Sequence, residues 1–126
     1  PPTPPSPLPP PRYAHSAIST DAFLLVFGGT NGKKKFNDIH IFDYGLMSSR
    51  IWIDGLEQGL WTLVNTSGDV PSPRFCATLV YDESLGRLYL FGGFDGARSN
   101  QLHMLDLESG IWSFVPCSGL LFFFLI

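Results

Sequence analysis

An internal repeat limits what this chain can fold into more than any other feature of its sequence. Four short blocks occur twice and in the same order, at offsets of 62, 64, 63 and 51 residues. The pairs are Pro11-Arg12-Tyr13 with Pro73-Arg74-Phe75, Leu24-Leu25-Val26-Phe27-Gly28-Gly29 with Leu88-Tyr89-Leu90-Phe91-Gly92-Gly93, Asn37-Asp38-Ile39-His40-Ile41-Phe42-Asp43 with Asn100-Gln101-Leu102-His103-Met104-Leu105-Asp106, and Leu60-Trp61 with Ile111-Trp112. Chance does not account for four ordered matches. They indicate two copies of one supersecondary unit, stacked so that each covers an apolar face of the other.

Each copy divides into four short β-rich runs separated by turn signals, and no useful stretch shows the 3.6-residue period of a helix. The runs carry apolar residues on both faces, as expected for a sheet that lies between two others. We expect strands at about residues 15–19, 23–27, 38–42 and 61–64, and again at about 76–81, 87–91, 102–107 and 112–115.

The ordered blocks resemble the kelch repeat, whose pattern has a Pro-Arg-aromatic opening, a strand ending in Gly-Gly, a strand closing in an apolar residue and Asp, and then a Trp. The resemblance covers about residues 11–119 and implies the four-stranded blades of a β-propeller. We therefore predict an all-β, partial kelch-type propeller of two antiparallel blades, residues 12–70 and 71–119, after a disordered Pro-rich segment at residues 1–11. Its expected structural residues are Gly28, Gly29, Gly92 and Gly93 at strand ends, with Trp61 and Trp112 between blades.

The repeat stops where a third copy should open. At an offset of 51, the Pro-Ser-Pro-Arg of residues 71–74 should return at residues 122–125, where the sequence has Phe-Phe-Phe-Leu. Two blades are too few to close a propeller. We expect the chain to be a fragment or a truncated form, with an apolar, aggregation-prone tail at residues 120–126.

Two segments lie outside the repeat pattern. The first copy has 12 extra residues between Asp43 and Trp61, an insert at about residues 44–60. Its residues 50–55 could form a hairpin that presents Trp52 as an interaction anchor, or could fold back over the blade edge. The P-x-x-P spacings of residues 1–11 could contact an SH3 or WW domain, but a plain lead-in is the simpler interpretation.

The sequence contains none of several common catalytic and nucleotide-binding motifs. The chain has no phosphate-binding or dinucleotide-binding glycine motif, no H-E-x-x-H and no G-x-S-x-G. His40 and His103 occupy the same position in separate copies, so they are predicted to be structural, and Cys76 is predicted to be a buried small hydrophobic residue. We predict no catalytic residue, no metal and no cofactor. The alternative is part of a metal-dependent kelch-like enzyme whose catalytic residues lie outside this chain.

Charge narrows the class of partner. A net charge of −3, with 15% charged residues, argues against a bulk nucleic-acid binder. The longest apolar run has seven residues, too few to span a membrane. No basic segment followed by an apolar one opens the chain, so we expect an intracellular, cytoplasmic protein.

Antiparallel blades place alternate loops at opposite ends, which separates the charges. The end that opens each first strand collects six basic residues against Asp38, Asp69 and Asp95, a net charge of +3, while the other end nets −6. We expect a protein-interaction scaffold whose basic end favours acidic partner segments. In the alternative, Arg12 and Arg74 bond carbonyls inside the blades. The predicted partner-binding residues are Arg12, Asn31, Lys33, Lys34, Lys35, Arg74, Phe94, Arg98 and Ser99.

Overall fold

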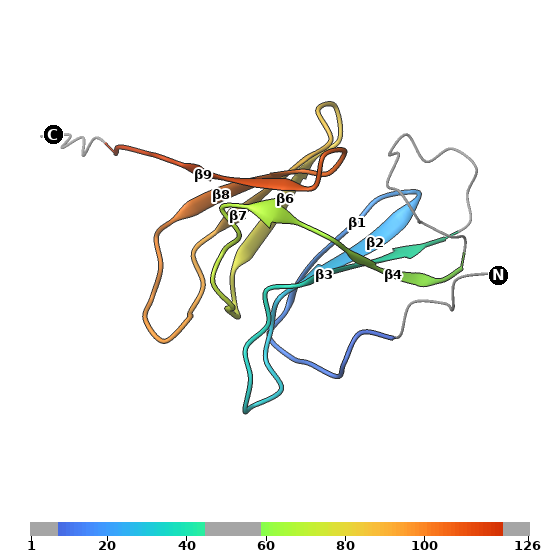
Figure 1. Cartoon of the computed structure of the whole chain (residues 1–126), viewed down its shortest axis with the longest axis horizontal. Coiled ribbons are helices and arrows are strands. Elements are labelled where there is room, and N and C mark those ends of the chain that lie inside the picture. The colour runs from blue at the N-terminus through green and yellow to red at the C-terminus, as the bar shows by residue number, and fades with distance from the viewer. Residues whose placement is uncertain (1–7, 45–58, 120–126) are drawn as a thin grey trace, which may run out of the picture.

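Nine strands in two sheets make up the described part of the chain, residues 8–44 and 59–119 of a computed structural model (Figure 1). The first sheet runs in chain order: β1 (Ser16–Ser19), β2 (Phe23–Phe27), β3 (Ile39–Asp43) and β4 (Trp61–Val64). The second runs β5 (Ser67–Gly68), β9 (Ile111–Val115), β8 (Leu102–Asp106), β7 (Arg87–Phe91) and β6 (Thr78–Asp82).

The prediction of an all-β chain with two antiparallel blades is confirmed, because four strands in each sheet pair in the same order with antiparallel neighbours. Residues 1–7, most of the predicted insert with its hairpin at 50–55, and the tail at 120–126 lie outside the described residues. At the C-terminal end of the Pro-rich segment, the carbonyl of Pro10 accepts a 3.1 Å hydrogen bond from the side chain of Arg12.

The two Gly-Gly segments close equivalent strands. Phe27 of β2 pairs with Ile39, and Phe91 of β7 pairs with Leu102, which are the matching positions of the two copies. All four glycines have positive φ, between 66° and 92°. A Cβ on Gly29 would lie 2.8 Å from the carbonyl oxygen of Tyr13, so this turn requires the absence of a side chain as well as the unusual backbone conformation.

Two details differ from the sequence-based expectation. Strand β6 begins at Thr78 instead of residue 76, and Cys76 is exposed, so the prediction of a buried Cys76 is wrong. Its φ is 57°, and Ala14, the equivalent residue before β1, has a φ of 55°. Backbone in this left-handed region does not continue a strand, and it turns the residue away from the ladder.

The second difference is β5, a fifth strand of two residues that was not predicted. Ser67 pairs with Ile111 and Gly68 with Trp112, in parallel orientation. The carboxylate of Asp69 then accepts a 3.1 Å hydrogen bond from the backbone of Phe114. The link that leaves the first sheet is therefore fastened along the outer strand of the second.

The core lies between the sheets. Rings contact across the interface, Phe23 with Tyr81 and Phe27 with Trp112, each pair with centroids 5.8 Å apart. Strands β1 and β6 also meet, where Ser16 donates its hydroxyl hydrogen to the carbonyl of Ala77. The buried cluster contains Phe23, Leu25, Phe27, Ile39, Ile41 and Val64 from the first sheet with Leu88, Leu90, Leu105, Leu107 and Trp112 from the second part of the chain.

Candidate functional site

The loops that carry most of the predicted binding residues lie at one end of the two sheets, the lower end in Figure 1. Isolated backbone bridges join Tyr13 to Thr30 and Phe75 to Phe94, which ties the opening segment of each blade to the loop after its second strand. The amide of Gly29 also donates to the carbonyl of Arg74, which connects the two blades here. We call this surface, residues 10–15, 30–36, 72–76 and 94–99, the loop end.

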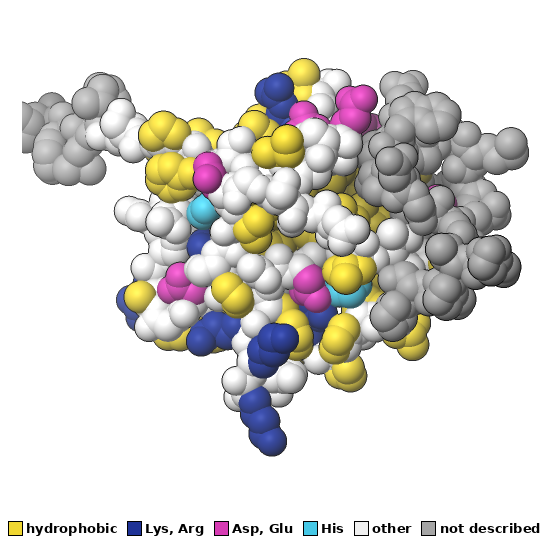
Figure 2. Space-filling view, in the orientation of Figure 1, with side chains coloured by type: hydrophobic (Ala, Val, Ile, Leu, Met, Phe, Trp, Pro, Cys, Tyr) yellow, Lys and Arg dark blue, Asp and Glu magenta, His cyan; other side chains and the backbone are white. Residues whose placement is uncertain are grey.

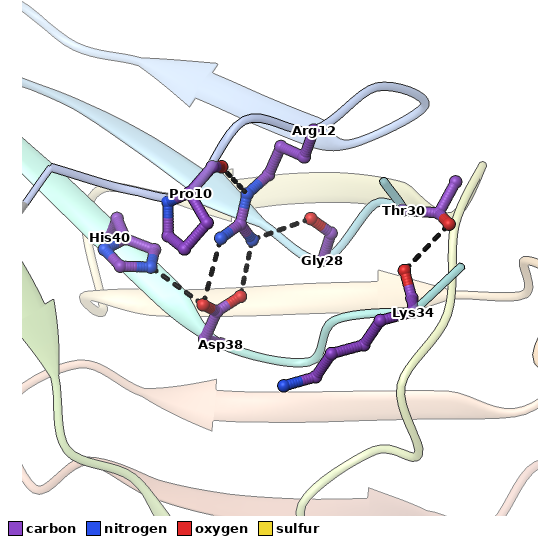
Figure 3. Close-up of polar contacts among 7 residues, drawn as sticks. All are labelled: Pro10, Arg12, Gly28, Thr30, Lys34, Asp38 and His40. Atoms are coloured by element: carbon purple, nitrogen blue, oxygen red, sulfur yellow. Dashed lines mark hydrogen bonds and ion pairs between the residues drawn. The ribbon is translucent and has the colours of Figure 1, made fainter. Parts of the chain in front are cut away.

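Arg12 is the centre of a polar cluster at the loop end (Figure 3). Its guanidinium makes a two-pronged contact with the carboxylate of Asp38, and it also donates a 3.0 Å hydrogen bond to the carbonyl of Gly28. The same guanidinium stacks on the ring of Phe36 at 4.1 Å. Only 4% of its side chain is exposed, so these partners cover most of the guanidinium of Arg12.

Asp38 is the anion that balances this cluster. Partial burial raises the pKa of its carboxyl, but hydrogen bonds from His40 and Arg12 and the charge of Arg12 outweigh that effect and hold the pKa well below its usual range. The carboxylate is therefore ionised at neutral pH and can only accept hydrogen bonds. It follows that Nε2 of His40, which lies 2.8 Å away, carries the hydrogen.

Arg74 occupies the equivalent position in the second blade but has different partners. It is 1% exposed and donates to the carbonyls of Ser72 and Gly92 and to the hydroxyl groups of Ser72 and Ser99. Gln101 stands where the first copy has Asp38, so no carboxylate touches the guanidinium here. Burial lowers the pKa of Arg74, and the nearby charge of Asp95 partly offsets the change.

These contacts favour the interpretation in which Arg12 and Arg74 bond carbonyls inside the blades over the one in which they bind a partner. Both guanidinium groups bond carbonyls within their own blades and lie beneath the surface, where they fix the strand openings. Ser99 serves the same purpose, because its hydroxyl accepts hydrogen bonds from Arg74 and from the amide of Gln101. A partner would therefore contact the other predicted partner-binding residues directly.

The exposed cations come from the two loops. Lys33, Lys34 and Arg98 are exposed, and Lys35 is half-buried. Figure 2 shows several Lys and Arg side chains along the lower edge of the molecule and one at its upper edge. The first loop is held in shape by Asn31, whose side-chain oxygen accepts hydrogen bonds from the amides of Lys33 and Lys34, so Asn31 orders the lysines.

Aromatic residues accompany these cations, and sequence reasoning passed over two of them. Tyr13 is exposed, and Phe75 packs on the exposed ring of Phe94 with centroids 5.3 Å apart. The signal was present in the repeat, since both copies have an aromatic residue directly after Pro-Arg. A flat ring beside a cation supplies contact area at low cost in side-chain entropy.

Metal-binding groups do not converge in the described ranges, 8–44 and 59–119, where no three His, Cys, Asp or Glu side chains come together. His40 and His103 lie on β3 and β8 of separate sheets. Burial and the charge of Arg74 lower the pKa of His103, which keeps its ring neutral at pH 7. The same ranges contain no helix that is long and apolar enough to cross a membrane.

Comparison with known proteins agrees with this architecture. The family model described as the Kelch motif matches residues 84–119. The chain is 33% identical over 115 residues to Kelch domain-containing protein 2 of Mus musculus, which covers 86% of this chain and 27% of that protein. It is 34% identical over 119 residues to Host cell factor 2 of Homo sapiens, covering 87% of this chain and 15% of the relative. It is also 37% identical over 103 residues to the dynein alpha chain of the flagellar outer arm of Chlamydomonas reinhardtii, covering 81% and 2%.

Two sheets share an equivalent set of four antiparallel strands, and each set is opened by an arginine with a buried side chain and turned by a Gly-Gly pair. These features define blades of a β-propeller built from sequence repeats. The matched motif and the similarity to kelch-domain proteins over both copies specify which repeat it is. The chain belongs to the kelch-repeat family. It spans 27% of the length of the curated Kelch domain-containing protein 2 relatives that it matches.

Proposed function

We propose that this chain is a protein-interaction module that binds its partner at the loop end and favours acidic partner segments. The observation that carries the proposal is the placement of Lys33, Lys34 and Arg98 on two loops of neighbouring blades, where all three are exposed at the loop end. The family membership supports the general role, because kelch propellers commonly present their loops to partner proteins.

The loop end has the features of a prepared binding surface. Its framework is rigid, since Asn31, Thr30 and the backbone bridges fix the first loop before any partner arrives. A surface whose shape is already set loses less conformational entropy on binding. The exposed rings of Tyr13 and Phe94 add apolar area beside the cations.

The charges of the described residues differ between the two ends of the sheets. Asp38 neutralises Arg12 within the blade, while the charges of Lys33, Lys34 and Arg98 have no ion pair with another described residue. At the opposite end of the sheets, exposed acidic residues such as Asp21, Glu83 and Glu108 stand at the turns. An acidic segment is therefore steered toward the loop end and repelled from the other.

We further propose that the protein works inside the cell, in the cytoplasm. Both cysteines, Cys76 and Cys117, are free thiols and exposed in the structure. Exposed unpaired thiols suit a reducing compartment, where they persist without forming disulfides.

The test measures binding of a fluorescein-labelled oligo-glutamate peptide by anisotropy, with an oligo-lysine peptide of the same length for comparison. We expect binding of the acidic peptide that weakens as salt is raised, and loss of about tenfold in affinity, ~1.4 kcal/mol, in the Lys33→Glu/Lys34→Glu variant. The control is Glu83→Lys/Glu108→Lys, which changes net charge by the same magnitude but with the opposite sign, at the far end, and should leave the affinity nearly unchanged.

Equal binding of both peptides, or an affinity that follows net charge in both variants regardless of position, would overturn the proposal. Circular dichroism of each variant shows whether the strands are intact. Lys33, Lys34, Glu83 and Glu108 are all exposed, so their replacement is expected to leave the fold unchanged.

A further inference from the structure

The backbone of the loop end forms one continuous hydrogen-bonded layer across both blades. In the first blade, Thr30 bridges to Lys35 on one side and to Tyr13 on the other. The two blades join where the amide of Cys76 donates a 2.8 Å hydrogen bond to the carbonyl of Ala14. The loop after β2 is therefore held at a fixed distance from the opening segment of the second blade.

The second blade continues this layer with aromatic residues. Phe75, directly before Cys76, exchanges two backbone hydrogen bonds with Phe94, 3.1 Å and 2.9 Å long, and Phe94 bridges onward to Arg98. Residues directly opposite in such a pair place their side chains close together, and these two rings pack with centroids 5.3 Å apart. Because Phe94 is 37% exposed, the pair presents an apolar surface to solvent.

Positive charge is concentrated at the other end of the layer. Lys33 and Lys34 are exposed on the loop that Thr30 begins. At the aromatic end, Asp95 is exposed on the same loop as Arg98 and offsets part of its charge. The carboxylate of Asp95 accepts a 2.7 Å hydrogen bond from Ser72, which holds it there. The layer is thus cationic at the lysines and apolar at the phenylalanines.

Tyr13 lies between the two ends of the layer and is 59% exposed. Its hydroxyl lies 3.7 Å from where a Cβ of Gly32 would stand, so its ring extends along the loop that carries the lysines. The backbone pairs of the layer put Thr30 and Phe94 three strand spacings apart, a distance of roughly 14 Å. An extended peptide crosses that distance in about four residues.

We infer that the loop end binds a peptide segment in which an aromatic residue lies about three to five residues from a cluster of Asp or Glu residues. This inference rests on the proposed function and adds to it the aromatic residue and its spacing. The aromatic ring packs on Phe94 while the carboxylates lie at Lys33 and Lys34. Paired aromatic rings contribute affinity beyond the area that they bury, and a ring loses little side-chain entropy.

The test compares two fluorescein-labelled peptides by anisotropy. One is Glu-Glu-Glu-Gly-Ser-Phe-Ser-Gly-Glu-Glu-Glu, and the other has Ala in place of Phe. Acidic residues on both sides make the result independent of the direction in which the peptide lies. We expect the Phe peptide to bind the unmodified chain about tenfold more tightly than the Ala peptide. Both affinities should weaken as salt is raised, but their ratio should stay the same, because salt screens charges and not the contact between rings.

Two variants separate the aromatic contact from the charges. Phe94→Ala should bring the affinities of the two peptides together and leave that of the Ala peptide nearly unchanged. Lys33→Glu/Lys34→Glu should weaken the binding of both peptides and keep their ratio. The matched control is Leu85→Ala, which removes a 56% exposed apolar side chain in the turn between β6 and β7 and should change neither affinity.

Circular dichroism checks that each variant is folded. Phe94→Thr, whose β-branched side chain suits paired backbone, replaces Phe94→Ala if that variant unfolds. Equal binding of the Phe and Ala peptides to the unmodified chain would overturn the inference and leave the proposed function standing. So would an advantage of the Phe peptide that persists without the ring of Phe94. Binding of the Ala peptide no tighter than that of a matched lysine peptide would overturn the proposed function, and this inference with it.

Discussion

Single residues at the loop end show how two copies of one motif neutralise a buried cation in different ways. Arg12 has a carboxylate partner in Asp38, whereas Arg74 relies on carbonyl and hydroxyl oxygens around Ser72, Gly92 and Ser99. A buried guanidinium is tolerated only when its donors are satisfied. The loss of either arginine therefore leaves buried acceptors without a donor.

Replacing Arg74 with Ala should lower the free energy of unfolding by about 2–4 kcal/mol, because the carbonyl of Gly92 loses its side-chain donor and a cavity remains. Urea denaturation of the unmodified chain and the variant measures the difference. Arg98→Ala is the control, since Arg98 is exposed, and it should change stability by less than about 0.5 kcal/mol. Equal effects of the two changes would mean that Arg74 does not hold the blade opening.

Asp38 should make stability depend on acidity. Its pKa is lowered in the fold, so its stabilising contribution is complete above the ordinary value of about 4 and is lost as the pH falls below it. Asp38→Asn should reduce the stability at pH 7 and flatten this acid dependence. Part of the dependence should remain, because hydrogen bonds from Ser84 and Ser72 also lower the pKa of Asp82 and of Asp95.

His103 should cause a second dependence of stability on pH, in a higher pH range than that of Asp38. Its lowered pKa means that the unfolded chain takes up a proton more readily, so stability should also fall as the pH drops through the ordinary histidine value of about 6.5. Urea midpoints measured across the pH range should keep this second dependence in Asp38→Asn. An unchanged profile below pH 4 in that variant would contradict the assignment to Asp38.

At the scale of strands and turns, the repeated glycines allow neighbouring segments of backbone to lie close together. Gly28 ends β2 where the carbonyl oxygen of Arg74, from the other blade, would lie 2.7 Å from an added Cβ. The glycine therefore sets the distance between two blades as well as the turn of one. Within each sheet, strands β1 to β4 and β6 to β9 lie beside their neighbours in the chain, as consecutive elements usually do.

A matched pair of glycines tests this spacing. Gly28 and Gly86 have nearly equal φ angles, 66° and 64°, but an added Cβ at Gly86 has no atom within 4 Å. Gly86→Ala should cost only the backbone strain of about 1–2 kcal/mol. Gly28→Ala should be clearly more destabilising in urea denaturation, because the blades must also separate. Equal losses would show that the approach of Arg74 is unimportant.

At the scale of the whole molecule, the two sheets stabilise each other through one continuous core. Trp112 lies at its centre, 1% exposed, with its ring against Phe27 of the other sheet. Two blades bury one pair of faces and leave a second pair for other contacts.

Trp112→Ala should lower the free energy of unfolding by about 3–5 kcal/mol, because it removes a buried ring and leaves a cavity between the sheets. Phe114→Ala, two residues along the same strand and 45% exposed, is the control and should cost much less. Urea denaturation followed by circular dichroism measures both. A similar loss in the two variants would argue against a core centred on Trp112.

The sequence by itself determined the strands, their order and the two-blade division, because short β-rich runs, turn residues and the Gly-Gly pairs act within a few neighbouring residues and occur twice. It also placed the charged loops at one end, since antiparallel pairing alternates the ends. Only the tertiary structure decided that Arg12 and Arg74 are covered, that Cys76 is exposed and that Ser67-Gly68 adds a strand to the second sheet. Burial depends on which neighbouring sheet covers a residue, and a local sequence pattern does not specify that neighbour.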